Sequence, residues 1–144
     1  MAVRYPPDTS DILVCHFVQA QEGSLRGSVV PEMVKTRPVA VVSAPGYAGY
    51  DRCIVVCLST TAPRRLKPWH YEITWETLLP SPYDRSAICW ALGDQIYTVS
   101  YKRLSLFSGG KDSQGKRLYL KRSLSPEQMV GVRSAIRAAL FLED

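Results

Sequence analysis

Two apolar runs, RPVAVVS at residues 37–43 and RCIVVCLS at residues 52–59, decide the fold of this chain. Both runs are rich in β-branched residues, and the turn-forming segment APGYAGYD at residues 44–51 separates them. Such runs between glycine- and proline-rich segments are typical of β-strands, and their uninterrupted apolar character predicts burial on both faces. We therefore expect two neighbouring strands at the centre of one sheet.

Shorter strand-like runs on both sides extend this sheet. They are DILVCHF at residues 11–17, WHYEITW at residues 69–75 and RLYLKRS at residues 117–123. AICWAL at residues 87–92 and QIYTVSYKRL at residues 95–104 supply more strand-like or short helical material, and Gly93 with Asp94 predicts a turn between them. FSGGKDSQGK at residues 107–116 predicts a flexible polar loop at the tip of a basic hairpin.

A single helix is predicted near the C-terminal end. Ser125 can cap this helix, Pro126 suits the first helical position, and Gln128 completes a capping box. An apolar stripe then recurs at helical spacing, at Met129, Val132, Ile136 and Ala139/Leu140. About six short antiparallel strands followed by this helix predict a mainly β (α+β) fold, a curled sheet or SH3-like barrel with the helix packed on it.

Length and composition indicate one domain. The 144 residues are 46% hydrophobic, enough for one core, so we expect residues 1–144 to form a single domain with a flexible N-terminal arm at residues 1–10. No apolar run approaches the roughly 20 residues of a membrane helix, and the N-terminus lacks an apolar signal segment. We therefore expect a cytoplasmic protein without a membrane partner. The four cysteines lie in apolar stretches without a CxxC pair, which favours buried packing over zinc binding or disulfides.

The charge distribution favours an anionic partner. The formal net charge is +5 and the sequence pI is about 9.1. Basic residues cluster at positions 64–67, 102–103, 111–122, 133 and 137, whereas acidic residues are scattered singly. One such cluster is usually a solvated surface, but several together favour a polyanion.

Several kinds of chemistry are disfavoured. Gly110 and Gly115-Lys116 have the spacing of a phosphate-binding loop, but Arg117 follows where a serine or threonine should hold magnesium. His16 and His70 are the only histidines, too few for a histidine-rich metal site, and His16 is expected to be a packed strand residue. No acidic cluster of the two-metal type occurs, so we expect neither a metal nor another cofactor.

Arg37 is the strongest candidate for a functional residue. It precedes Pro38 at the rim of a buried strand, and its planar guanidinium matches phosphate oxygens, although a structural ion pair is the simpler explanation for the residue alone. LSTTAP at residues 58–63 ends the next strand with three hydroxyls, which alone are typical of turns. If the two strands are neighbours, these groups converge on one anion, beside the basic and aromatic segment at residues 64–70.

The order of these segments resembles the PemK/MazF family of toxin-antitoxin ribonucleases, over about residues 12–142. The resemblance is carried by ILVCHF (12–17), KTRPVAVVS (35–43), CIVVCLSTTAP (53–63) with PWHYEI (68–73), GDQIYTVSYKRL (93–104) and the C-terminal helix. It implies a homodimer of SH3-like barrels that cleaves single-stranded RNA, such as mRNA, at short sequences without a metal. The ribose 2′-hydroxyl attacks its own phosphate in such enzymes, which leaves a 2′,3′-cyclic phosphate and a 5′-hydroxyl. A cognate antitoxin protein is expected as a further partner.

The resemblance also assigns roles to residues. Arg37 matches the family's catalytic arginine, and the catalytic hydroxyl falls on Ser59 or Thr60. Asp94 matches an aspartate that takes part in catalysis in some members, whereas Leu92 replaces an arginine that some members carry. The residues expected to contact RNA are Lys35, Thr61, Arg64, Arg65, Lys67, Trp69, His70 and Gln95. The alternative is a barrel without catalysis that binds RNA or a protein target such as DNA gyrase.

Overall fold

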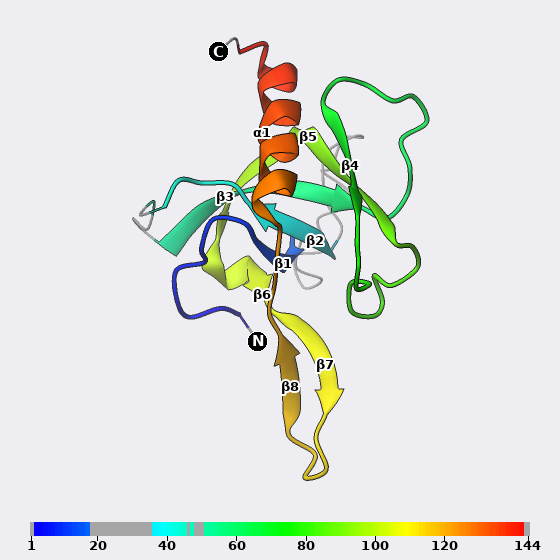
Figure 1. The fold of residues 1–144 in the computed structure, drawn as a ribbon. Helices are drawn as coiled ribbons and strands as arrows, with labels where there is room; N and C mark the ends of the chain where they lie inside the picture. The colour runs from blue at the N-terminus through cyan, green and yellow to red at the C-terminus, as the bar shows by residue number, and fades with distance from the viewer. Residues whose placement is uncertain (1, 18–35, 46, 48–50, 143–144) are drawn as a thin grey trace, which may run out of the picture.

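The computed structural model describes residues 2–17, 36–45, 47 and 51–142 (Figure 1). The strands are β1 (Asp11–His16), β2 (Thr36–Val41), β3 (Arg52–Ser59), β4 (His70–Thr74), β5 (Ile88–Ser100), β6 (Leu104–Ser105), β7 (Phe107–Lys111), β8 (Arg117–Leu120) and β9 (Arg122–Ser123). A short 3-10 helix, η4 (Tyr101–Arg103), precedes β6, and the α-helix α1 (Pro126–Leu140) follows β9.

One antiparallel sheet carries most of the fold. Its strand order is β4-β5-β3-β2-β1-β6, and β9 also pairs with β1. β2 and β3 are neighbours at its centre, with Val39 opposite Cys57 and Val41 opposite Val55. The predicted mainly β fold, a curled antiparallel sheet with one C-terminal helix, is therefore confirmed.

The central strands are buried on both faces, as predicted. Alternate residues of β2 and β3 point to a helix-side core, which includes Ala40 and Val56, and to a far-side core, which includes Val39 and Val55. The four cysteines are buried and unpaired: Cys15, Cys53 and Cys57 lie in the far-side core, and Cys89 lies in the helix-side core. Burial raises the pKa of Cys15 and Cys57 to about 12, so these thiols are packing groups and not nucleophiles.

The predicted turn at Gly93 and Asp94 is wrong. β5 runs unbroken through both residues, and its register with β3 jumps from the Leu92–Cys57 pair to the Ile96–Val56 pair. Residues 93–95 therefore form a bulge within one long strand. Glycine fits there because α1 packs directly on it: a Cβ on Gly93 would lie 2.6 Å from the backbone carbonyl carbon of Ala135.

The predicted helix begins as expected. Ser125 Oγ accepts a hydrogen bond from the Gln128 backbone N–H at 3.1 Å, and Gln128 Oε1 accepts one from the Ser125 N–H at 2.8 Å. Met129 and Val132 are buried against the sheet, but Leu140, predicted in the same stripe, is exposed. The stripe ends early because α1 extends past the edge of the sheet (Figure 1).

The segment predicted as a flexible polar loop, residues 107–116, is instead largely a strand and a turn. β7 pairs with β8 in a separate two-stranded sheet, and Figure 1 shows this hairpin projecting away from the body of the molecule. Phe107 is buried at its foot. The N-terminal arm, for which the sequence predicted flexibility, is held by a hydrogen bond from the Val3 N–H to the Leu104 carbonyl at 2.9 Å.

Candidate active site

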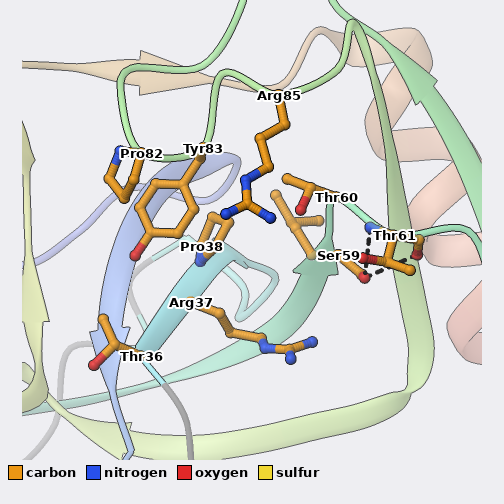
Figure 2. Close-up of a pocket in the computed structure, with 10 residues that line it drawn as sticks. Thr36, Arg37, Pro38, Ser59, Thr60, Thr61, Pro82, Tyr83 and Arg85 are labelled. Carbon is orange, nitrogen blue, oxygen red and sulfur yellow. Dashed lines mark hydrogen bonds between the residues drawn. The ribbon is translucent and has the colours of Figure 1, made fainter.

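A cleft of about 420 Å³ opens where β2 begins and β3 ends (Figure 2). We call it the strand-end cleft. Its lining residues come from β2 (Thr36, Arg37, Pro38), from the end of β3 and the turn after it (Leu58, Ser59, Thr60, Thr61), and from the β4–β5 loop (Pro82, Tyr83, Arg85). The register explains the convergence, because the pairing of Val39 with Cys57, continued by two residues, places Arg37 opposite Ser59.

Arg37 lies half-buried in the strand-end cleft. Its Nε atom is buried and has no hydrogen-bond partner within the described part of the chain. Between described residues the one ion pair joins Lys121 to Asp8, so the alternative explanation, a structural ion pair to Arg37, finds no support there. A buried guanidinium nitrogen without a partner is costly, which is typical of a group reserved for a ligand.

The hydroxyls of Ser59 and Thr60, both in the cleft lining, differ in how they are used. Ser59 Oγ donates to the Thr61 carbonyl at 2.9 Å and accepts from the Thr61 N–H at 3.1 Å, so this hydroxyl stabilises the turn. The Thr60 hydroxyl makes no hydrogen bond to any described residue, and Figure 2 shows it facing the guanidinium of Arg85. Thr60 is therefore better placed than Ser59 to donate to a bound anion.

Sequence reasoning missed Arg85 and Tyr83. Figure 2 shows the Arg85 guanidinium entering the cleft from the side opposite Arg37, so two cations approach one space. The loop that carries Arg85 is held at its start by Arg122, whose guanidinium donates to the carbonyls of Thr77 at 2.6 Å and Leu78 at 2.8 Å. No local pattern predicts this placement; the only available signal was a second arginine close to a proline-rich turn.

Tyr83 anchors a later part of the same loop, two residues before Arg85. Its ring meets the ring of Phe107 edge to face, with centroids 6.0 Å apart. Burial raises the pKa of the Tyr83 hydroxyl, and the nearby charge of Arg37 opposes that rise. Tyr83 therefore joins the wall of the strand-end cleft to the foot of the β7–β8 hairpin.

Asp94 and Gln95 lie near the cleft but do not line it. Both belong to the β5 bulge, where the Asp94 side chain is exposed and the Gln95 Oε1 atom is buried without a partner among the described residues. The Arg37 and Asp94 charges both act on Cys57, but no ion pair joins the two within the described chain. The bulge thus brings a carboxylate to the neighbourhood of Arg37 without neutralising it.

The other residues expected to contact RNA are distributed unevenly. Thr61 lines the cleft, whereas the side chains of Arg64, Arg65 and Lys67 are exposed on the following loop, outside the lining. Trp69 and His70 also lie outside the lining; their rings meet edge to face, with centroids 6.1 Å apart, and His70 Nδ1 accepts a hydrogen bond from the Lys67 N–H at 3.1 Å. Lys35 lies outside the described residues.

His16 is exposed, so the prediction of a packed strand residue is wrong. It is the last residue of β1, opposite Thr36, and its Nδ1 lies 3.2 Å from Thr36 Oγ1. Thr36 lines the strand-end cleft, so His16 lies next to a residue of the cleft without lining it. Among the described residues no three metal-ligating side chains gather at one point. No described helix is long and apolar enough to span a bilayer.

The fold and the site define a class: a curled β-sheet protein with a cleft of arginines and hydroxyls at the ends of its central strands. The family model for PemK-like, MazF-like toxins of type II toxin-antitoxin systems matches residues 9–140. The chain belongs to this family. A comparison with curated protein sequences gives no significant match.

Solved structures share the fold. An endoribonuclease from a mycobacterial species is 19% identical, with a TM-score of 0.57 over 97% of this chain and 96% of that chain. A mycobacterial endoribonuclease in complex with its cognate antitoxin is 19% identical, with a TM-score of 0.54 over 96% and 99% of the two chains. MazF from Deinococcus radiodurans is 17% identical, with a TM-score of 0.58 over 96% and 99%.

Proposed function

We propose that this protein is a metal-independent, sequence-selective endoribonuclease that cleaves single-stranded RNA, such as mRNA in the cytoplasm. One observation carries the proposal: Arg37, whose buried Nε has no partner among the described residues, and Thr60, whose hydroxyl is unengaged among them, share one cleft with Arg85. Two cations and a hydroxyl donor suit the two non-bridging oxygens of a phosphodiester, which carry its negative charge. Membership of a toxin family supports the same conclusion.

The proposed reaction is an internal transesterification. The ribose 2′-oxygen attacks the adjacent phosphorus and loses its proton, while the bond from phosphorus to the 5′-oxygen breaks and that oxygen gains a proton. The products are a 2′,3′-cyclic phosphate and a 5′-hydroxyl. Negative charge grows on the non-bridging oxygens in between, and positively charged donors fixed beside them lower that barrier.

Arg37 and Arg85 would stabilise the phosphorane oxygens, and Thr60 would donate a hydrogen bond to one of them. Ser59 would hold the turn that presents Thr60, since its hydroxyl is engaged with Thr61. Asp94 is the proposed carboxylate for proton transfer, because the β5 bulge leaves it exposed and its charge, like that of Arg37, acts on Cys57 of the strand between them. The exposed basic loop at residues 64–67 would follow the RNA backbone.

We also propose a cognate antitoxin and a homodimeric assembly. One structural relative forms a complex with its cognate antitoxin. An acidic antitoxin segment would find charge complementarity in a chain of net charge +5 with two arginines in one cleft. Binding there would exclude RNA.

The test is cleavage of long single-stranded RNA in excess EDTA, with the new 5′ ends mapped and their terminal groups identified. We expect discrete cuts with 5′-hydroxyl ends. In Arg37→Ala the cleavage rate should fall by about 10²-fold or more, as it does when one donor to a transition-state oxyanion is removed. Arg133→Ala removes one exposed cation on α1, outside the cleft and the basic loop, and is the matched control. Both variants should remain folded, which thermal melts verify.

Intact RNA with binding retained would contradict the nuclease and favour a non-catalytic RNA-binding module. A tight complex with DNA gyrase or another protein, without RNA affinity, would favour a protein-targeting toxin instead. Cleavage that requires a divalent metal would contradict the proposed mechanism.

A further inference from the structure

We infer that one face of the β7–β8 hairpin, together with the apolar pocket at its foot, is a second binding surface for single-stranded RNA. The choice of RNA as the polymer rests on the proposed function. The surface is separate from the strand-end cleft, because the two share no lining residue. We call it the hairpin surface; its residues are Arg4, Tyr5, Lys111, Arg117 and Tyr119.

Strand pairing determines which side chains share this face. Ser108 pairs with Tyr119, and Lys111 pairs with Arg117, across a bulge at Gly110, whose φ is 88°. Directly paired residues lie on the same side of a hairpin, and one extra residue on β7 keeps the alternation of β8 intact. Tyr119, Lys111 and Arg117 therefore project from one face, and all three are exposed.

The cation pair does not serve the hairpin's own stability. Like charges directly opposite one another on two strands are destabilising. Within the described chain no carboxylate forms an ion pair with Lys111 or Arg117. The nearest acid in sequence, Asp112, is used inside the turn, where its Oδ1 accepts from the Gln114 N–H at 2.9 Å and the Lys116 N–H at 2.8 Å. An anionic partner would relieve the repulsion between the two cations.

Next to the cations, Tyr119 enters a pocket of about 240 Å³. The pocket is lined by Ala2, Val3, Arg4, Tyr5, Leu106 and Tyr119. Its floor is apolar, and two partly exposed tyrosine rings and one guanidinium border it, which suits a planar base that stacks. The Ala2 bridge to Ser105 and the Val3 hydrogen bond to Leu104 hold the arm that forms one wall.

The hairpin begins beside the cleft, but the hairpin surface lies on its other face, because the consecutive residues Phe107 and Ser108 point to opposite sides and Ser108 shares its side with Tyr119. Phe107, at the foot of β7, contacts Tyr83 of the cleft wall, and Lys111 lies four residues further, roughly 13 Å along an extended strand. Alternating phosphates and bases would meet the cation pair and the tyrosine pocket in turn. A short oligonucleotide that fills only the cleft would not reach the hairpin.

The experiment measures binding by fluorescence anisotropy against salt concentration. The probes are a 20-nucleotide and a 4-nucleotide 2′-O-methyl RNA, which cannot be cleaved because the attacking hydroxyl is blocked. Variants are Lys111→Gln/Arg117→Gln, Tyr119→Ala and Tyr119→Phe. The control Lys102→Gln/Arg133→Gln removes the same charge from exposed positions elsewhere. Thermal melts and analytical ultracentrifugation accompany each variant.

We expect the hairpin double variant to reduce the slope of log K against log salt for the long RNA by about 1.4, roughly 0.7 for each lost phosphate contact. Tyr119→Ala should lower the affinity for the long RNA by roughly tenfold and leave the salt slope unchanged. Tyr119→Phe should retain the wild-type affinity, since stacking needs only the ring. The short RNA should bind all variants alike.

Three results would overturn the inference. The first is a hairpin double variant that binds the long RNA like its control. The second is unchanged RNA binding together with weakened binding of poly-glutamate, which would assign the surface to an acidic protein. The third is a change in oligomeric state confined to the hairpin variants, which would assign it to a second copy of the chain. If the long RNA binds through the hairpin but unmodified RNA is not cleaved, the proposed nuclease activity is contradicted and the hairpin surface is not.

Discussion

Polar groups have opposite environments in two regions of the molecule. One region is the seam where α1 packs on the sheet, and the other is the strand-end cleft. At the seam, the Ser125 and Gln128 side chains complete each other's backbone hydrogen bonds, and Gly93 lets the helix backbone touch the sheet. In the cleft, Arg37 Nε is buried without a partner and the Thr60 hydroxyl is unengaged among the described residues. This difference indicates that the seam contributes stability, and it agrees with the proposed role of the cleft in binding a ligand. Substitutions at the two places should therefore affect different measurements.

The largest expected effect is on the cleft hydroxyls. Thr60→Val keeps the side-chain shape and removes the donor, so cleavage should fall by about 10²-fold while the melting temperature stays unchanged. Ser59→Ala should cost about 1 kcal/mol of unfolding free energy through its turn, with a smaller loss of cleavage. Single-turnover RNA cleavage and urea unfolding measure both. A reversed pattern would make Ser59 the catalytic hydroxyl.

The next effect is on the seam. Gly93→Ala places a methyl group against backbone atoms of Ala135 and Trp69, which cannot move aside as a side chain can. Overpacking of this kind should lower the free energy of unfolding by about 1–3 kcal/mol. Urea unfolding measures the change, with Ser134→Ala on the exposed side of α1 as the control. An unchanged midpoint would mean that the seam is loosely packed and would weaken the contrast with the cleft.

A smaller effect is expected at the helix start. Ser125→Ala removes one capping hydrogen bond and the hydroxyl that orients Gln128, so unfolding should become easier by about 1 kcal/mol. RNA cleavage measured under folded conditions should stay at the wild-type rate, because no described contact links this cap to the cleft. A loss of cleavage without a loss of stability would show that the two regions are coupled.

The smallest expected effect is on the pH dependence of the unfolding free energy, and it comes from the far-side core. It is absent at neutral pH. Burial raises the pKa of Cys15 and Cys57 from 9.0 to about 12, so both thiols are neutral in the folded protein while the unfolded chain ionises near pH 9. Their contribution to stability is complete below pH 9 and is lost as the pH rises towards 12. Cys15→Ala/Cys57→Ala should flatten this alkaline decline in urea unfolding. An equal decline in the double variant would assign the effect to other groups.

The sequence predicted half of the cleft. Arg37 and the hydroxyls were found because antiparallel neighbours bring the start of one strand beside the end of the next, which needs only two strand assignments. Arg85 and Tyr83 were missed because their loop has no periodicity and is placed by contacts distant in sequence, to Arg122 and Phe107. Local patterns contain no information about such contacts.

Two errors in the predicted fold have a common origin. Gly93-Asp94 and Gly109-Gly110 both carry the residues of a turn, yet one pair lies in a bulge of β5 and the other lies within β7. Glycine serves two different purposes here: Gly110 adopts a φ of 88° in its bulge, whereas Gly93 makes room for the backbone of α1. The hairpin tip and the strand at residues 117–123 were predicted, but β7 was predicted as a loop because four of its five residues are exposed and two are glycines.

The unpartnered Nε of Arg37 has a consequence for evolution. A buried donor without an acceptor costs about 1–3 kcal/mol, so replacement of Arg37 by an apolar side chain of similar length should make the chain more stable. A population selected for folding alone would lose this arginine early, whereas one selected for growth arrest would keep it. Under the proposed function, Arg37 therefore lowers stability in exchange for activity.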